Sequence, residues 1–171
     1  AEKQWLKAIA VPTYLKVAES YQNIAMCQLG IDKFAEAEAS LKKALSHSPN
    51  SAMTLYQLAQ LFYAKRDFKS SKTAISQYER ATRKFQPEVL ALAYKVQKKL
   101  GNNVGAKNYA GMLLKMFPKS AQTKQLLENQ LAVIPADELA KRYRKSKLAS
   151  TSVISSNQKE GSKKVLRFSP K

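Results

Sequence analysis

The residue types that most often carry out chemistry in proteins are scarce in this sequence. The single histidine, His47, stands in a Ser-His-Ser-Pro turn, which predicts a surface position. The single cysteine, Cys27, stands in the middle of a helical segment with no histidine beside it, which predicts a buried structural thiol. A thiolate or imidazole metal site needs several such ligands, so we expect no metal.

The glycines do not indicate a phosphate-binding loop. Gly101, Gly105 and Gly111 follow no strand and lack the spacing of loops that cradle phosphates. We expect Gly105 and Gly111 to allow close contact between helices instead. The twelve acidic residues stand mostly singly, and no Ser-His-Asp arrangement is indicated. The sequence therefore predicts no enzymatic activity, no cofactor and no small-molecule substrate.

Positive charge is the strongest chemical signal. The formal net charge is +18, and the last 35 residues hold ten Lys or Arg against three acids. Two basic runs, Lys141 to Lys147 and Lys163 to Arg167, have the composition that binds nucleic-acid phosphates or anionic lipid headgroups. The competing interpretation is a solvated helix end followed by a tail. No nucleic-acid-binding fold signature accompanies the charge, so nucleic acid is not the expected partner.

An internal repeat predicts the elements that carry these residues. When the sequence is shifted by 34 residues it matches itself. The matched pairs are Tyr21 and Leu55, Ala25 and Ala59, Phe34 and Phe68, Ala37 and Ser71, Leu41 and Ile75, and Ala44 and Tyr78. A third copy contains one inserted residue and places in the corresponding positions Leu90, Tyr94, Gly101, Ala106, Ala110, Leu113 and Pro118.

The repeat resembles the tetratricopeptide repeat (TPR), a pair of antiparallel helices. Small residues such as Ala25 allow the two helices to cross closely, and Phe34 and Phe68 fill the end of each pair. A proline such as Pro118 ends the second helix. The expected fold class is all-α, a TPR right-handed α-solenoid of antiparallel helix pairs. Because Tyr94 stands where a small residue is expected, we expect the third pair to pack at an altered angle.

Periodicity and capping residues set the expected limits of the elements. One helix start can be capped by Asn50 or Ser51, and another by Asp67. Pro87 suits the first turn of a helix, and Gly101 suits the left-handed position at the end of one. The predicted helices run at about 14–29, 34–47, 51–65, 68–84, 87–100, 104–117, 120–131 and 137–148.

The chain is expected to divide into three parts. Residues 1–131 form the TPR helical domain, with about three repeats, residues 132–148 a C-terminal basic helix, and residues 149–171 a disordered basic tail. We expect Glu2 to Ala10 to be the second helix of a truncated pair, separated by a break at Val11-Pro12-Thr13.

The third copy carries a more specific likeness. Its segments resemble the C-terminal end of the type IV pilus biogenesis and stability proteins, the PilW or PilF pilotin family. Those segments are Leu92-Ala93-Tyr94-Lys95-Val96, Leu100-Gly101-Asn102, Ala106 to Tyr109, and Leu113 to Ser120. Gln28 to Pro49 resembles the penultimate repeat of that family, and Pro12-Thr13-Tyr14 resembles the irregular link before it.

The resemblance implies a location and a partner. Members of the family are outer-membrane lipoproteins of the Gram-negative periplasm that help the pilus secretin to insert and multimerise. The implied partner is therefore that secretin, bound without a cofactor. No apolar run reaches the roughly 18 residues that a membrane helix needs. Membrane association is expected only through an N-terminal lipid anchor, which, like the first repeats, would precede Ala1.

The first helices of a TPR array line its concave face, where a partner would bind. Tyrosines on that face are stiff, amphipathic contacts for a peptide, and lysines can bind an acidic segment. The competing interpretation is that the tyrosines are partly core and the lysines a solvated face. The residues that we expect to form this peptide-binding groove are Gln22, Met26, Met53, Tyr56, Gln60, Tyr63, Lys95, Lys98 and Lys99.

The sequence thus predicts a non-enzymatic protein–protein interaction scaffold, a pilotin-like factor for type IV pilus biogenesis and secretin assembly. Two alternatives remain open. One is a general TPR chaperone or assembly adaptor of another system. The other is a nucleic-acid or anionic-surface binder that acts through the basic C-terminal region, whose binding would fall steeply with salt.

Overall fold

The computed structural model describes the backbone of residues 2–128 and 134–165, and the side chains of residues 15–128 and 134–153. The described residues form eight helices and no strand. The helices are α1 (Glu2–Gly30), α2 (Phe34–His47), α3 (Ala52–Ala64), α4 (Phe68–Ala81), α5 (Pro87–Lys99), α6 (Asn103–Met116), α7 (Ala121–Leu127) and α8 (Pro135–Val165).

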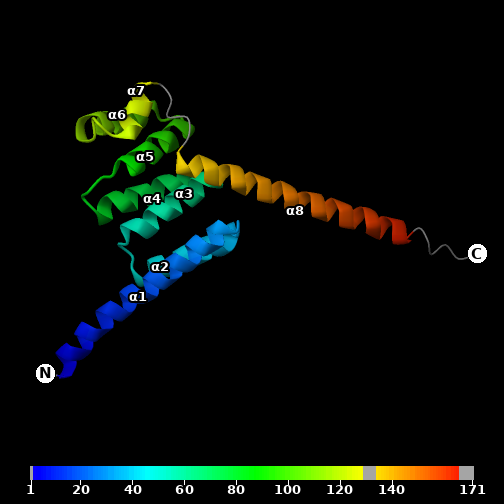
Figure 1. The fold of residues 1–171 in the computed structure, drawn as a ribbon, viewed down its shortest axis with the longest axis horizontal. Coiled ribbons are helices and arrows are strands. Elements are labelled where there is room, and N and C mark those ends of the chain that lie inside the picture. The colour runs from blue at the N-terminus through cyan, green and yellow to red at the C-terminus, as the bar shows by residue number, and fades with distance from the viewer. Residues whose placement is uncertain (1, 129–133, 166–171) are drawn as a thin grey trace, which may run out of the picture.

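Six of these helices form three antiparallel pairs, α1 with α2, α3 with α4, and α5 with α6, which stack along one direction (Figure 1). The pairs pack closely because small residues lie at each crossing. Ala25 and Ala37 are fully buried between the first two helices. In the second pair the Ser71 hydroxyl donates a buried hydrogen bond of 2.7 Å to the Ala59 carbonyl. The expected α-solenoid is therefore confirmed.

The three turns inside the pairs share one backbone conformation. Asp32, Arg66 and Gly101 occupy equivalent repeat positions, and their φ angles are 60°, 64° and 74°. Each turn closes with the same two backbone hydrogen bonds, as in Asp67 N–H to the Phe62 carbonyl and Arg66 N–H to the Tyr63 carbonyl. This left-handed conformation suits glycine, so two of the three turns hold a residue that strains the backbone.

Side chains fix the starts of the helices at the expected places. Ser51 and Asp67 accept hydrogen bonds from the N–H groups of Thr54 and Ser70, respectively, and Pro87 occupies the first turn of α5. Each cap satisfies a backbone donor that the helix leaves without an internal partner.

The two expected glycine contacts have different outcomes. A Cβ atom on Gly105 would lie 2.8 Å from the Asn102 side chain and 2.9 Å from that of Gln97, so the close approach of α5 and α6 there is confirmed. A Cβ on Gly111 would meet nothing within 4 Å, so the contact expected there is wrong. Gly111 lies on a part of α6 that no neighbouring helix covers closely.

Two helices run further than expected. Helix α1 continues from Glu2 to Gly30, so the structure has no break at Val11-Pro12-Thr13. A proline removes one helical hydrogen bond without always ending a helix, and the chain on both sides of Pro12 keeps its helical path.

Helix α8 continues to Val165, whereas the sequence led us to expect disorder from residue 149. In the Ser/Thr stretch the hydroxyls donate to carbonyls one turn back, as Ser150 does to Ser146 and Thr151 to Lys147, so each hydroxyl finds its acceptor within the helix. Residues 166–171 lie outside the described residues. Figure 1 shows the second half of α8 leaving the helix pairs as an isolated arm.

The left-handed conformation of the turn residues predicts that substitution by glycine has opposite effects on stability at two sites. Arg66→Gly should stabilise the protein by roughly 1 kcal/mol, because glycine adopts the left-handed conformation without the Cβ penalty. Lys72→Gly, at an exposed position inside α4, should destabilise it by about 1 kcal/mol. Urea unfolding followed by circular dichroism measures both. A loss of stability in Arg66→Gly would contradict the account of the turn.

Candidate functional site

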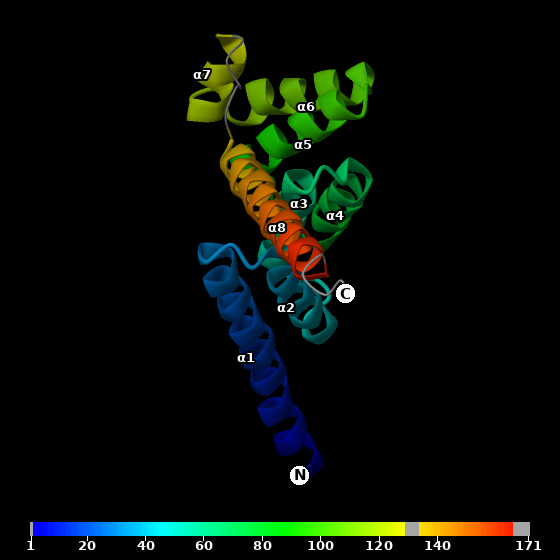
Figure 2. The same ribbon diagram turned by 90° about the vertical axis from the view of Figure 1, so that its right-hand side faces the viewer.

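The first helices of the three pairs, α1, α3 and α5, form one face of the stack, and α8 lies across it (Figure 2). Helix α8 packs mainly on α3, and its side chains also reach α1 and α5. The concave face that sequence reasoning assigned to a partner is thus partly covered by the chain's own C-terminal helix.

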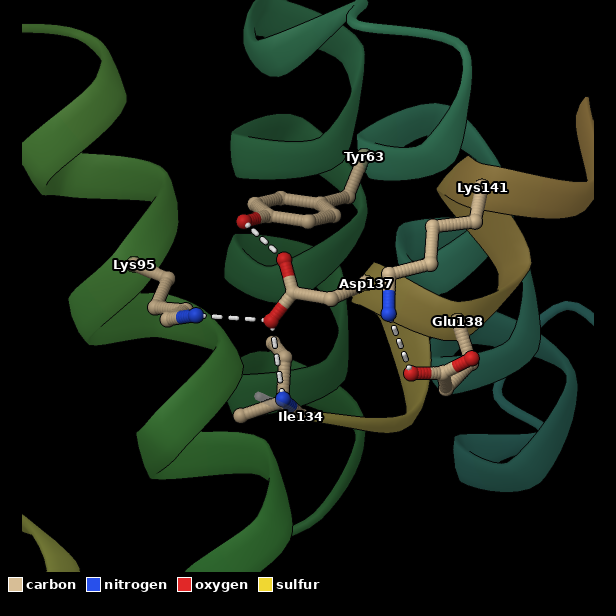
Figure 3. Close-up of polar contacts among 6 residues, drawn as sticks. All are labelled: Tyr63, Lys95, Ile134, Asp137, Glu138 and Lys141. Atoms are coloured by element: carbon tan, nitrogen blue, oxygen red, sulfur yellow. Dashed lines mark hydrogen bonds and ion pairs between the residues drawn. The ribbon is translucent and has the colours of Figure 1, made fainter. Parts of the chain in front are cut away.

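A carboxylate anchors the start of α8 to this face. The Asp137 side chain accepts a hydrogen bond of 2.8 Å from the Tyr63 hydroxyl on α3 and lies 2.6 Å from the Lys95 ammonium on α5. It also accepts the Ile134 backbone N–H at 2.8 Å, which caps α8 itself. Figure 3 shows both oxygens of Asp137 turned toward α3 and α5, which belong to the three stacked helix pairs that form the body of the protein.

Burial and hydrogen bonding act in opposite directions on this carboxyl group. Burial raises the pKa of Asp137, but the hydrogen bonds from Lys95, the Ile134 N–H and Tyr63 outweigh it and hold the pKa below the ordinary aspartate value. Burial, together with the bond to Asp137, raises the pKa of the Tyr63 hydroxyl, which therefore remains a proton donor.

Apolar contacts continue along α8 from the carboxylate. Ile134 and Ala136 are buried in the same cluster as Tyr63 and Val96. Further along the helix, Leu139 and Tyr143 pack on the buried cluster beneath α1 and α3. The Tyr143 and Phe34 rings pack in a T-shaped arrangement with 5.2 Å between ring centroids.

An arginine fixes α8 to the turn between α1 and α2. The Arg142 guanidinium donates to the Asp32 carboxylate at 2.7 Å and also to the Leu29 carbonyl. Asp32 is one of the left-handed turn residues, so the strained turn places its carboxylate where Arg142 can reach it. Together, Asp137 and Arg142 fasten the first three turns of α8 at two points.

Part of the concave face stays open beside α8. A cleft of about 440 Å³ lies between α1, α3 and the start of α8. Met26 and Met53 are 51% and 60% exposed there, so about half of each apolar side chain faces solvent. The lining residues are Met26, Leu29, Gly30, Met53, Tyr56, Gln57, Gln60, Pro135, Glu138, Leu139 and Arg142.

A second cavity, of about 260 Å³, lies on the opposite side of α8. Four cations line it, Arg66 and Lys99 from the body and Lys141 and Arg144 from α8. Asp137 is the one acid among its lining residues. The surroundings of the Asp137 anchor are therefore strongly positive.

The nine residues that were expected in the groove are divided by the structure. Met26, Met53, Tyr56 and Gln60 line the open cleft together. Tyr63 and Lys95 instead bind Asp137 beneath α8.

The other three expected residues lie elsewhere. Lys99 lines the cationic cavity, and Lys98 is exposed with its ammonium 5.9 Å from the centre of the Tyr94 ring. Gln22 is half-buried on α1 and does not line the open cleft.

Sequence reasoning missed the residues that α8 contributes, namely Asp137, Leu139, Arg142 and Tyr143. Their signal was available in the spacing of Ala136, Leu139, Ala140 and Tyr143, which repeats every three to four residues as on one helix face.

His47 and Cys27, the two residues singled out for chemistry, both lie at the surface. His47 is exposed, as expected, and stacks on Tyr21 with 5.8 Å between ring centroids. Cys27 is also exposed, so the expected buried thiol is wrong. Ala25 and Leu29 face the second helix, which turns Cys27 toward solvent.

Within the described part of the chain, no group of three or more His, Cys, Asp or Glu side chains could hold a metal ion. In the same part, none of the helices has the combination of length and apolar character that crossing a membrane requires.

Comparison with known proteins bears out the repeat. Residues 31–100 match the family model described as tetratricopeptide repeat. The fold is similar to the crystal structure of PilW, described as a widely conserved type IV pilus biogenesis factor, with a TM-score of 0.62 and 28% identity. That match covers 71% of this chain and 55% of the PilW chain.

A second solved structure, PilF of Pseudomonas aeruginosa, shares the fold with a TM-score of 0.59 and 18% identity. That match covers 69% of this chain and 53% of the PilF chain, so this chain spans about half the length of both relatives. No curated protein matches the sequence.

The match over residues 31–100 and the stacked helix pairs define the fold, which is that of a tetratricopeptide-repeat α-solenoid. Among solved structures it resembles PilW, the type IV pilus biogenesis factor.

The Asp137 anchor predicts a defined pH dependence. Because the pKa of Asp137 is lowered by folding, its stabilising effect is full above the unfolded value near 4 and is lost as the pH falls through the folded value. Asp137→Asn should therefore cost about 2 kcal/mol of unfolding free energy at pH 7. The difference from the unmodified protein should shrink below pH 4. Urea titrations across this range measure it, and a difference that persists unchanged at pH 3 would contradict the anchor.

Proposed function

We propose that this protein is a non-catalytic interaction scaffold in type IV pilus biogenesis, acting as a pilotin-like factor on the pilus secretin. One observation carries the proposal: the helix pairs match those of PilW over 71% of the chain at 28% identity. Pilotin activity in turn places the protein in the periplasm at the outer membrane, with no cofactor.

The binding surface in this proposal is the open cleft beside α8. Its methionines are flexible, polarizable side chains that adapt to an irregular apolar surface, and Tyr56 adds a stiff ring. Burial and the nearby Glu88 raise the pKa of the Tyr56 hydroxyl to about 12, so it is a neutral hydrogen-bond donor. It also accepts a hydrogen bond of 3.0 Å from Gln60. A segment of the secretin would bury the two methionines and leave the helix pairs unchanged.

The cleft predicts which substitutions weaken binding. Met26→Gln together with Met53→Gln should lower affinity for the purified secretin of the same organism by about tenfold, because the contact loses apolar area. Met116→Gln is the matched control, since Met116 is 48% exposed on α6, outside the cleft. Biolayer interferometry measures the affinities. Secretin that does not bind, or that binds all variants equally, would contradict the proposal.

The exposed positive charge of α8 favours a second candidate function, binding to an anionic surface. Exposed cations follow one another along the helix at Lys141, Arg144, Lys145 and Lys147, just before the helix leaves the stacked pairs (Figure 1). A helix of this charge is attracted to anionic lipid or to nucleic-acid phosphates.

The second candidate predicts a strong salt dependence. Binding of the protein to vesicles containing phosphatidylserine should fall steeply between 50 and 200 mM salt, on the order of tenfold or more. Replacing Arg144, Lys145 and Lys147 with glutamine should remove it. Co-sedimentation with vesicles measures binding, and neutral phosphatidylcholine vesicles are the control. Binding that ignores salt would exclude this candidate.

A further inference from the structure

The start of α8 is held in the way that a TPR face would hold a separate helix. Its side chains bridge the first helices of all three pairs, with a carboxylate at one end and an arginine at the other. The contacts between these points are apolar packing, through Ala136, Leu139 and Tyr143. This is helix-in-groove recognition, and in it the chain's own helix takes the place of the ligand.

The charge of α8 is poorly matched to the face that it covers. Residues 135–148 carry two acids against five Lys or Arg, and the cavity beside Asp137 already contains Arg66 and Lys99 from the body. Lys141 and Arg144 of α8 line the same cavity, which therefore gathers four cations around one acid, Asp137. Asp137 is the part of the helix that complements the positive surface.

We propose that Tyr63 and Lys95 form a carboxylate-binding site for an acidic amphipathic partner helix, and that the start of α8 occupies this site in the absence of the partner. The proposal rests on the proposed scaffold function and adds the chemistry of the partner. The partner places an Asp or Glu in its first turn between Tyr63 and Lys95. Its apolar side chains, spaced as Ala136, Leu139 and Tyr143 are, replace those of α8.

Acidic side chains further along the partner helix would meet Arg66 and Lys99. In the structure, Lys141 and Arg144 of α8 line the cavity with these two cations instead. The partner therefore gains electrostatic energy that α8 lacks, and this difference allows the partner to displace the internal helix. Displacement would also release the whole of α8 from the body.

The test uses the full chain and a labelled peptide with the sequence of residues 134–148, acetylated at its N-terminus. Fluorescence anisotropy measures peptide binding. The unmodified protein should bind weakly, because its own α8 fills the site. Asp137→Asn in the protein should tighten peptide binding by roughly tenfold, because the site is then open in a larger fraction of molecules.

Glu138→Gln is the matched control in the protein. It removes the same charge from the neighbouring position, but Glu138 pairs with Lys141 on its own helix at 3.0 Å. Figure 3 shows the Glu138 side chain turned away from Tyr63 and Lys95. This variant should bind the peptide like the unmodified protein. Arg142→Gln is a second way to loosen α8, at its other anchor, and should also tighten peptide binding. Circular dichroism verifies that each variant keeps its helical content.

Two altered peptides test the chemistry of the site. The Asp137→Asn variant of the full chain, in which the site is open, is called the opened protein. A peptide that itself carries Asp137→Asn should bind the opened protein about tenfold more weakly than the natural peptide does, because it lacks the charged acceptor. A peptide with Lys141→Glu and Arg144→Glu should bind more tightly than the natural sequence, because these two positions line the cavity with Arg66 and Lys99. The proposal is overturned if the opened protein does not bind the natural peptide, or if neither peptide change alters binding.

Failure of the peptide experiment and failure of the secretin experiment have different meanings and can be told apart. A secretin that does not bind contradicts the pilus assignment and leaves the carboxylate site standing if the peptides behave as stated. Peptides that do not bind overturn the carboxylate site, whatever the secretin does at the methionine cleft.

Discussion

The structure depends on the close crossing of two helices within each pair. Ala25 against Ala37, and Ala59 against Ser71, bring the backbones near enough that larger side chains around them form one continuous core. A single helix pair cannot bury its own apolar face, so each pair needs a neighbour. The stacking that results leaves the first helices side by side, with Tyr63 and Lys95 projecting from neighbouring pairs. The carboxylate site exists because the repeat places these two side chains next to each other.

The same stacking explains why α8 lies where it does. An uncovered row of first helices exposes apolar surface, and the helix that begins at Pro135 covers part of it with Ala136, Leu139 and Tyr143. The covering is incomplete, since Met26 and Met53 remain more than half exposed in the cleft beside it. This face therefore has two parts, an open apolar cleft and a polar anchor that α8 occupies.

Much of the fold could be predicted from the sequence because it is set by contacts that recur every 34 residues. The helix expected at 34–47 is found from Phe34 to His47, and the left-handed turn expected at Gly101 is present. The candidate site was only half predictable. Tyr56 and Met53 follow from the repeat, whereas the docking of Asp137 joins residues 74 positions apart outside any repeat. The prediction that Cys27 is buried was wrong because a position in the middle of a helix does not show which side of α1 packs on α2.

The central claim, that α8 lies along the concave face, can be tested directly by a distance measurement in solution. The exposed Cys27 is the only cysteine, so spin labels at Cys27 and at a second cysteine introduced by Lys145→Cys would report the position of α8 relative to α1. Double electron–electron resonance should give one narrow distance distribution in the isolated protein. A broad distribution, with α8 sampling many positions, would contradict the account.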